Sequence, residues 1–450
     1  MQNTKNIDQR SVLYGLINKD YIVIDRAQGM YLYDTEGKKY LDIVGGAAVV
    51  TIGHSVPEVI DAITEQAKKV CYVYGGTFTN EARIKLAAKI IEMSPRGMDK
   101  VFFCSGGSEA VESAIKIARQ YQLEKGYTSK YKVISRWQSY HGNTIATLSV
   151  GGRPTWRAKY TPYLLQFPHI AQCNCYRCPY GLEYPKCNIK CAWELEKVIK
   201  YEDAETVSAF ILEPVIGTTA SAMVPPNEYF PIIRDICDKY KVLLIVDEII
   251  TGMGRTGKNF AVDHFNVVPD IIATAKGLGS GYAIIAAVIV HKKITDALIN
   301  GTGELTHSFT FAGSPLACAT GLAVVEYLNK NNLIQRSAEM GKIFLNKLCR
   351  LKELPMVGDV RGIGLLLGVE LVKNKETKQP YEPGKKVAKL VADYCRENGV
   401  LIIAGVTGSS DGISGDHLQL SPPFIINEKE IDFVVNVLER AINDVYNRLK

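Results

Sequence analysis

The chain has 450 residues, which is enough to bury a large core and to form two or three domains. Apolar residues make up 47% of it and charged residues 22%, and the net charge of +6 is spread without a long basic run, so nothing indicates binding to nucleic acid or to a membrane. The polar N-terminus and 11 scattered cysteines predict a cytoplasmic protein with reduced thiols.

The N-terminal part alternates short apolar runs with turns. A helical arm is expected over residues 1–20, followed by three short strands that are separated by Gly29 and by the Glu36-Gly37 turn. The strands are predicted at 21–24, 30–33 and 39–42, and their spacing indicates a small antiparallel meander. Apolar residues then recur at helical spacing over 56–70 and 81–93.

A strand predicted at 101–104 is followed at once by Ser105-Gly106-Gly107-Ser108-Glu109 and then by helical periodicity. A strand, a Ser/Gly turn and the start of a helix can form an anion site, because free backbone N–H groups and the helix dipole point at the turn. The alternative is a helix N-cap by Ser105 or Ser108, with Glu109 in the first turn.

Strands and helices then alternate. A strand at 131–135 leads into Tyr140-His141-Gly142, and a second one at 207–212 ends at Glu213. A helix is expected at 229–240, followed by strands at 242–246, at 271–274 and, in an antiparallel sense, at 284–290. This order predicts a mixed or parallel sheet wrapped by helices.

Chemically active side chains follow two of these strands. Asp247 and Glu248 end one strand, and Lys276 follows the next with glycines on its C-terminal side. Because ligands bind at the carboxyl ends of strands in open α/β sheets, these groups are expected to share a site. A lysine amine and a carboxylate are what pyridoxal phosphate requires, the first for a Schiff base and the second for its pyridine nitrogen. The alternative is a surface lysine and an aspartate that caps a loop.

The C-terminal part has a different rhythm. A long helix is predicted over 315–350. Beyond it, strands are expected at 362–370, 400–403 and 418–420, and helices at 384–397 and 428–447. This pattern indicates a separate α+β unit that the long helix joins to the preceding sheet.

Taken together, these motifs resemble the class III (ω-amino acid) aminotransferases, pyridoxal phosphate enzymes of fold type I. The resemblance extends from Tyr31 to about Asn443, and its most specific part is the segment 247–282. Further matching segments are CSGGSEAVESAIKIAR (104–119), YHG (140–142), EPVIG (213–217) and HSFTFAGSP (307–315). The resemblance implies an α/β fold with a pyridoxal phosphate-binding large domain over 51–320 and a mostly parallel central sheet. The implied smaller α+β domain combines an N-terminal arm and strands within 1–50 with the segment 321–450.

The resemblance also implies roles for individual residues. Lys276 and Asp247 are the catalytic pair: the lysine holds the cofactor and moves the proton, and the aspartate pairs with the pyridine nitrogen. The implied cofactor-binding residues are Gly106, Gly107, Ser108, Tyr140, His141, Glu213, Asp247, Ile249, Lys276 and Thr310. In this set the glycine turn with Ser108 binds the phosphate, and Ile249 and Tyr140 cover the two ring faces. Thr310 reaches the phosphate from the second subunit of a homodimer, and a dimer of dimers is left open.

One departure from the family pattern concerns the substrate. Ornithine- and 4-aminobutyrate-type relatives carry an arginine at the position of Gln419, where it pairs with the glutamate that matches Glu213. Its absence favours pyruvate over 2-oxoglutarate as the acceptor. Arg153 and Arg157 lie in the region where a group that binds the substrate carboxylate is expected, without a choice between them. Arg255 is interpreted as a partner in a structural ion pair rather than as a substrate contact.

A cysteine cluster stands apart from these motifs. Its spacing is C-x-C-x2-C-x8-C-x3-C, and its members are Cys173, Cys175, Cys178, Cys187 and Cys191. Such a pattern can bind zinc or an iron–sulfur cluster. We favour an insertion loop of reduced, partly buried cysteines, so no metal ligand is assigned.

The leading hypothesis is therefore a transaminase that moves an amino group from an ω-amine or ω-amino acid to a 2-oxo acid, with pyruvate as the expected acceptor. A racemase or epimerase with the same cofactor and lysine is a second reading, because both reactions use the same groups. A non-catalytic metal- or redox-sensing relative is a third. The amine donor is not specified by the sequence.

Overall fold

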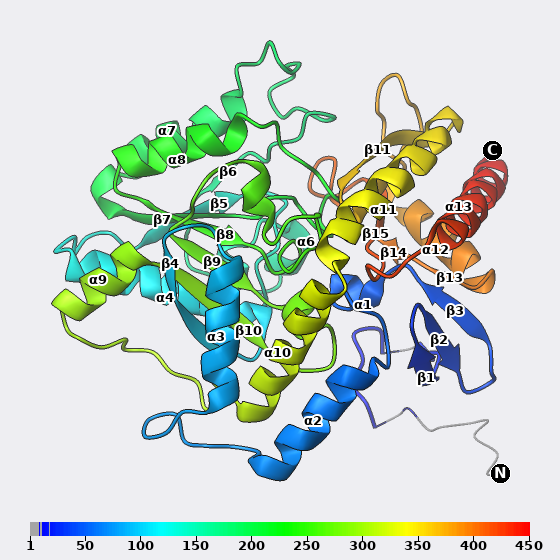
Figure 1. Ribbon diagram of the computed structural model, residues 1–450. Helices are drawn as coiled ribbons and strands as arrows, with labels where there is room; N and C mark the ends of the chain where they lie inside the picture. The colour runs from blue at the N-terminus through cyan, green and yellow to red at the C-terminus, as the bar shows by residue number, and fades with distance from the viewer. Residues whose placement is uncertain (1–8, 10, 18) are drawn as a thin grey trace.

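The computed structural model describes residues 9, 11–17 and 19–450, and its centre is a seven-stranded sheet with the order β4-β10-β9-β8-β7-β5-β6 (Figure 1). The strands are β4 (Met98–Cys104), β5 (Lys132–Arg136), β6 (His169–Ile170), β7 (Val207–Leu212), β8 (Leu243–Asp247), β9 (Ile271–Thr274) and β10 (Ala286–His291). The pairs formed by β5 with β6, β5 with β7, β7 with β8 and β8 with β9 are parallel, whereas β10 is antiparallel to both β4 and β9. The predicted, mostly parallel sheet is confirmed.

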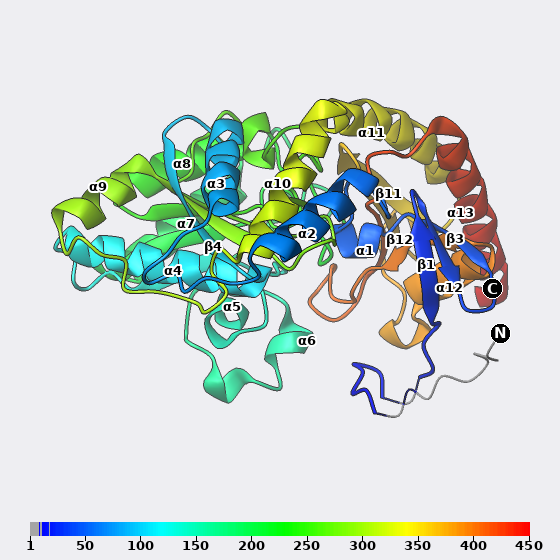
Figure 2. The ribbon, with the colours of Figure 1, turned by 60° about the horizontal axis from the view of Figure 1, so that its bottom comes forward.

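Helices cover both faces of this sheet (Figure 2). The helices of this part of the chain are α2 (Pro57–Lys69), α3 (Glu81–Met93), α4 (Gly107–Glu124), α5 (Ile145–Val150), α6 (Pro154–Arg157), α7 (Lys190–Tyr201), α8 (Tyr229–Lys239) and α9 (Lys292–Asn300). Phe210 and Leu244 pack with the α7 and α8 side, while their neighbours Ala209 and Leu243 pack with α4 on the other side. Because successive side chains of a strand point to opposite faces, only continuous apolar runs such as those of β7 and β8 can bury both.

The N- and C-terminal segments together form two small sheets beside the central one. The strands are β1 (Ile24–Gln28), β2 (Tyr31–Asp34), β3 (Lys39–Asp42), β11 (Val357–Ile363), β12 (Leu366–Leu371), β13 (Val400–Leu401), β14 (Ile403–Ala404) and β15 (Asp416–Leu420). The sheet orders are β1-β2-β3-β13 and β11-β12-β15-β14, so the predicted antiparallel meander β1-β2-β3 receives a parallel strand from the C-terminal part. The remaining helices are α1 (Gly45–Ala48), α10 (Pro315–Lys330), α11 (Leu333–Cys349), α12 (Val387–Glu397) and α13 (Glu428–Leu449).

Several predictions about local structure were wrong. The first strand is Ile24–Gln28 rather than 21–24, and the strand over 400–403 is two strands, β13 and β14, which belong to different sheets. The described part of 1–20 contains turns and bends but no helix, and residues 1–8, 10 and 18 lie outside the described residues. The long helix over 315–350 is two helices, because Asn332 has left-handed backbone angles (φ 52°) between α10 and α11. The strand over 362–370 is a hairpin of β11 and β12, which turns at Gly364 with φ 56°. A left-handed residue interrupts the predicted helix over 315–350 and the predicted strand over 362–370, and the apolar periodicity continues across each break.

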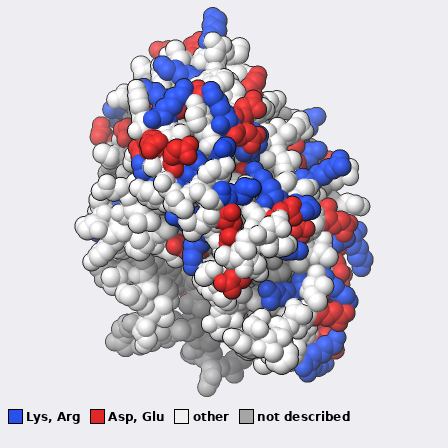
Figure 3. Space-filling model, turned by 90° about the vertical axis from the view of Figure 1, so that its left-hand side faces the viewer, with Lys and Arg blue, Asp and Glu red and all other residues white. Residues whose placement is uncertain are grey.

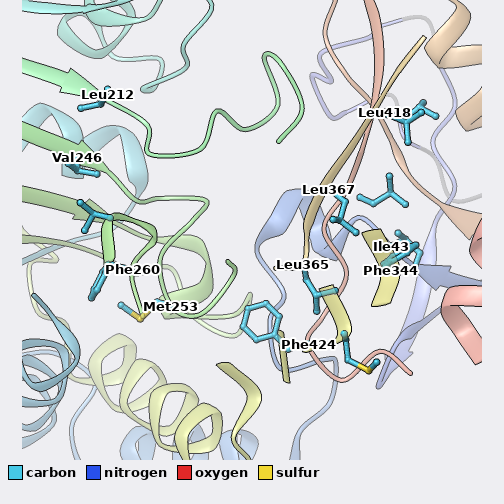
Figure 4. Packing of buried hydrophobic residues seen from close by; sticks show 14 of the residues in the cluster. Ile43, Leu212, Val246, Met253, Phe260, Phe344, Leu365, Leu367, Leu418 and Phe424 are labelled. Carbon is cyan, nitrogen blue, oxygen red and sulfur yellow. The ribbon is translucent and has the colours of Figure 1, made fainter. Parts of the chain in front are cut away.

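One buried hydrophobic cluster connects the central sheet with the small sheets (Figure 4). In Figure 4 Leu212 and Val246 lie on strands of the central sheet, Leu367 and Leu418 lie on the other side, and Phe424 lies between them. This shared core fixes the small sheets against the carboxyl ends of the central strands.

Basic and acidic side chains are intermingled on the face shown in Figure 3. Within the described residues, no helix is both long enough and apolar enough to cross a membrane.

Candidate active site

A cavity of about 310 Å³ lies at the carboxyl ends of the central strands. All the predicted site residues except Thr310 line it: Gly106, Gly107, Ser108, Tyr140, His141, Glu213, Asp247, Ile249 and Lys276. They come from the ends of five different strands, β4, β5, β7, β8 and β9, and from the loops that follow them, which the order of the sheet brings to one edge.

The N-terminus of α4 forms one wall of the cavity. Gly106 is the N-cap residue, and no side chain caps this helix. The alternative of a helix N-cap by Ser105 or Ser108 is therefore wrong. The Ser108 hydroxyl instead accepts a hydrogen bond from the Asn143 backbone N–H at 3.1 Å. A Cβ on Gly107 would lie 2.9 Å from Ile249 Cδ1, so glycine lets the turn and Ile249 approach closely. Uncapped N–H groups at the positive end of an 18-residue helix are suited to an anion such as a phosphate.

Asp247 and Glu248 are adjacent in sequence, but their carboxylates face different parts of the protein. The Asp247 carboxylate lines the cavity and accepts hydrogen bonds from His141 Nδ1 at 2.7 Å and from the Ile249 N–H at 3.1 Å. The Glu248 carboxylate points into the protein, where it accepts hydrogen bonds from two backbone N–H groups at 3.0 and 2.8 Å, and burial raises its pKa to about 7. The role of His141 is therefore to hold the Asp247 carboxylate in place beside the cavity.

Lys276 begins a short 3₁₀ turn after β9, with its side chain largely enclosed by protein but open to the cavity. Its backbone has φ 38°, a conformation that is uncommon for a residue with a side chain and that often marks a functional site. Burial lowers the pKa of Lys276 from 10.5 to about 8, although the nearby carboxylates Asp247 and Glu213 favour the ammonium form. A neutral, nucleophilic amine is therefore accessible near pH 8.

This lowered pKa predicts how covalent capture of pyridoxal phosphate by the apoenzyme depends on pH. Below pH 8 the Lys276 amine is mostly protonated and unreactive, and above it the neutral amine predominates. The rate of cofactor capture is expected to rise with pH along a titration curve with a midpoint of about 8 and to level off above it. Stopped-flow absorbance measures this rate. Nα-acetyl-lysine, which keeps a free side-chain amine, is treated in parallel and corrects for the titration of pyridoxal phosphate itself. A rate that still rises in proportion to hydroxide above about pH 9.5 would contradict the assignment, because an ordinary lysine has a pKa of about 10.4.

Glu213 follows β7 and is fixed by the backbone. Its carboxylate accepts hydrogen bonds from the N–H groups of Tyr140 at 3.2 Å and Gly217 at 3.0 Å, and burial raises its pKa. Glu213 therefore has two backbone hydrogen bonds, and it forms no salt bridge with any described residue. Arg136, which the sequence reasoning missed, donates to the Glu213 backbone carbonyl at 2.6 Å and also stabilises the ionised carboxylate. Gln419 does not line the cavity; it lies on β15, where its amide is 3.5 Å from the Ser421 hydroxyl.

Thr310 lies outside this cavity. Its side chain is exposed, and its backbone carbonyl accepts a hydrogen bond from the Tyr72 hydroxyl at 3.1 Å. Nearby, Phe311 is 63% exposed, and Ile284, at the rim of the cavity, is 80% exposed. An exposed position is what the expected contribution of Thr310 to a second subunit requires.

Two arginines considered from the sequence are structural. Arg255 is fully buried and donates to backbone carbonyls, among them Pro422 at 2.5 Å, and it forms no ion pair with any described residue. The predicted ion pair is therefore wrong, although the structural role is correct. Arg157 donates through Nη1 to the carbonyls of Leu148, Ser149 and Gly151 at 2.6–2.9 Å. The amino-acid sequence contained no signal for these backbone contacts.

The cysteine cluster lies between β6 and the start of α7. Cys173 is buried and Cys175 exposed, while Cys178, Cys187 and Cys191 are half-buried. Contacts with the thiols of Cys175 and Cys191 raise the pKa of Cys173. Among the described residues, no group of three or more His, Cys, Asp or Glu side chains is arranged so that it could hold a metal ion.

The cavity residues fit pyridoxal phosphate. The uncapped start of α4 suits the phosphate, and the close approach of Gly107 and Ile249 leaves no side chain in its way. Asp247 offers a buried carboxylate for the pyridine nitrogen, and Lys276 offers an amine with a lowered pKa for the aldehyde carbon. Lys276 is not an isolated surface lysine. Asp247 does cap the following loop through the Ile249 N–H, but its carboxylate also meets His141 and lines the cavity.

The known proteins described here, to which this chain is similar, are aminotransferases, in agreement with the family that the sequence motifs resemble. The sequence profile of the family aminotransferase class-III matches residues 16–442. The taurine–pyruvate aminotransferase of Bilophila wadsworthia is 37% identical over 426 residues, which is 93% of this chain and 92% of that protein. The putrescine–pyruvate aminotransferase of Pseudomonas aeruginosa is 34% identical over 425 residues, 94% of this chain and 90% of that protein. The crystal structure of an (S)-enantioselective omega-transaminase from Thermomicrobium roseum superposes with a TM-score of 0.90 and 37% identity, covering 96% of this chain and 95% of that one.

Proposed function

Because this chain belongs to the class III aminotransferase family, we propose that it is a pyridoxal phosphate-dependent transaminase that moves an amino group from an ω-amine or ω-amino acid to pyruvate. The observation that carries the proposal is the meeting of Lys276, Asp247 and the uncapped N-terminus of α4 around one cavity. The fold is that of fold-type I transaminases, as predicted. Among the named relatives described above, all are transaminases, so a racemase receives no support from them.

Each residue has a task that follows from its surroundings. Bound here, the cofactor supplies an aldehyde carbon for the amine and a conjugated ring that accepts electrons. The α4 N-terminus holds the phosphate, and Asp247, fixed by His141, holds a proton on the ring nitrogen. Lys276 Nζ attaches the cofactor and, once released, accepts the proton from the donor carbon and returns it, because its pKa of about 8 suits both directions near neutral pH. Tyr140 and Ile249 line the ring site and exclude water.

We further propose that the active form is a homodimer in which Thr310 of each subunit completes the phosphate site of the other. The exposure of Thr310, of its neighbour Phe311 and of Ile284 at the cavity rim supports this assembly. A second subunit that covered these side chains would bury apolar surface and close the cavity to water.

Pyruvate is expected to be preferred over 2-oxoglutarate. The described residues that line the cavity include two carboxylates, Asp247 and Glu213, and Lys276 as the single lysine or arginine. The second carboxylate of 2-oxoglutarate would have no guanidinium partner there and would be repelled, whereas pyruvate has only one carboxylate. The expected ratio of kcat/KM for the two acids is at least about tenfold, or about 1.4 kcal/mol.

A panel of amine donors, each assayed with both acids and followed by product identification, measures this preference. A donor given without an acid should convert the cofactor to pyridoxamine phosphate and then stop, whereas continued turnover would indicate racemisation. A preference for 2-oxoglutarate would mean that another cation compensates in the cavity, and it would contradict this choice of acceptor. The two named relatives with pyruvate as acceptor support the same expectation.

A further inference from the structure

A second, open hollow of about 850 Å³ adjoins the cofactor cavity, and we call it the entrance groove; its lining includes Asn143, Arg153, Trp156, Lys159 and Thr407. Tyr140, which lines the cofactor cavity, contacts two residues that line this groove. Asn143 Nδ2 donates to the Tyr140 hydroxyl at 3.1 Å, and the Trp156 ring meets the Tyr140 ring edge-on with centroids 5.4 Å apart. A substrate that reaches the reactive carbon past Tyr140 would therefore extend into the entrance groove.

Arg153 is the notable cation of this groove. Its guanidinium carbon lies 4.2 Å from the centroid of the Trp156 ring, which holds the guanidinium in one place. Burial lowers the pKa of Arg153 to about 10. Within the described residues the guanidinium has neither a hydrogen-bond acceptor nor a carboxylate partner, and its Nε is buried without a partner. Partial burial of an unpaired charge is costly, so this position is suited to an anionic ligand.

The other arginines around the site are already engaged. Arg136, Arg157 and Arg255 each donate to backbone carbonyls, as described above. Arg153 alone among these four keeps its donors uncommitted and lines a hollow that a substrate can enter. A guanidinium presents a planar fork of N–H donors that matches a carboxylate in a bidentate manner.

We propose that Arg153 binds the carboxylate of the substrates, both the 2-oxo acid and an ω-amino acid donor, an inference that rests on the proposed transaminase function. Pyruvate and a monocarboxylic ω-amino acid each satisfy this one arginine. A monoamine that has no carboxylate leaves Arg153 without a partner and gains nothing from it. Arg153 is thus a specificity-determining residue for carboxylate-bearing substrates, and it touches no part of the cofactor in this assignment.

The test compares Arg153→Gln with Lys159→Gln in the holoenzyme. Lys159 is an exposed cation on the same groove, so its variant removes the same charge without removing the fork. In Arg153→Gln we expect the half-saturating concentrations of pyruvate and β-alanine to rise by about 10- to 100-fold, the loss typical of a hydrogen bond to a charged group. Conversion of the cofactor by an amine that has no carboxylate, such as butylamine, should change by less than about threefold, and Arg153→Lys should recover part of the loss. Lys159→Gln should change none of these values.

Calorimetric titration with propionate, which has a carboxylate but neither an amine nor an oxo group, gives a readout that is independent of turnover. Its affinity should fall in Arg153→Gln and persist in Lys159→Gln. Unchanged half-saturation by pyruvate, equal losses for butylamine and β-alanine, or equal effects of the two variants would each overturn the proposal. If the wild-type enzyme converted no amine, the proposed function would fail, and propionate binding would still decide the role of Arg153.

Discussion

Lys276→Ala is expected to abolish both turnover and covalent attachment of pyridoxal phosphate. Lys276 is the described lysine that lines the cavity, and its position between two carboxylates with a pKa of about 8 suits attachment and proton transfer. Removing a group that performs both tasks should lower kcat by about five orders of magnitude or more, which corresponds to about 7 kcal/mol. Steady-state assays measure the loss, and borohydride reduction followed by peptide mass spectrometry locates the adduct in the wild type.

The fold should survive this substitution. Burial disfavours the Lys276 ammonium, so its removal deletes an unfavourable charge, and the melting temperature of the apoenzyme should not fall. Lys159→Ala, which removes an exposed lysine from the nearby groove, should retain both the adduct and the activity. An adduct at another lysine in the Lys276→Ala protein would refute the assignment.

Asp247→Asn should leave the cofactor bound but lower the rate by about three orders of magnitude or more, which is about 4 kcal/mol. Asparagine keeps the shape of the side chain and can still meet His141 and the Ile249 N–H, but it carries no charge to hold a proton on the pyridine nitrogen. An unprotonated ring accepts electrons poorly, so the step at the donor carbon should slow most. Single-turnover absorbance measurements with an amine donor isolate that step.

Glu248→Gln provides the matched control, because Glu248 is the adjacent buried carboxyl and points away from the cavity. This variant should lower the melting temperature, since two buried N–H groups lose part of their acceptor, while the rate per folded holoenzyme stays within about tenfold. If Asp247→Asn also lost tenfold or less, about 1.4 kcal/mol, Asp247 would not be the partner of the ring nitrogen.

Much of the site could be predicted because its signals are local. The apolar runs at 207–212 and 242–246 required strands buried on both faces, and β7 and β8 are such strands. Side chains directly after parallel strands meet at one edge of the sheet, so Glu213, Asp247 and Lys276 could be expected together before any coordinates were known. An anion site at the glycine turn before α4 could also be predicted, but the sequence did not exclude the alternative of a side-chain cap.

The corrections concern interactions that no local pattern records. Asn332 and Gly364 break two predicted elements through left-handed backbone angles, which apolar periodicity does not reveal. Arg157 looked equivalent to Arg153 as a cation near the site, but backbone carbonyls occupy its donors. Arg255 was expected in a structural ion pair, and backbone carbonyls take that place as well. Whether an arginine keeps free N–H donors depends on whether carbonyl groups of other segments approach its guanidinium. No local sequence pattern shows this.

The sheet, the chemical groups at its strand ends and the helix terminus suited to an anion follow from local sequence patterns, because burial and strand alternation act over a few residues. The pairing of those groups depends on how distant segments pack. His141 and Asp247 are 106 residues apart and meet at 2.7 Å, and Asp247 rather than Glu248 faces the cavity. Adjacent residues at a strand end point in different directions, but which direction leads to the cavity is set by the helices and loops packed around the sheet.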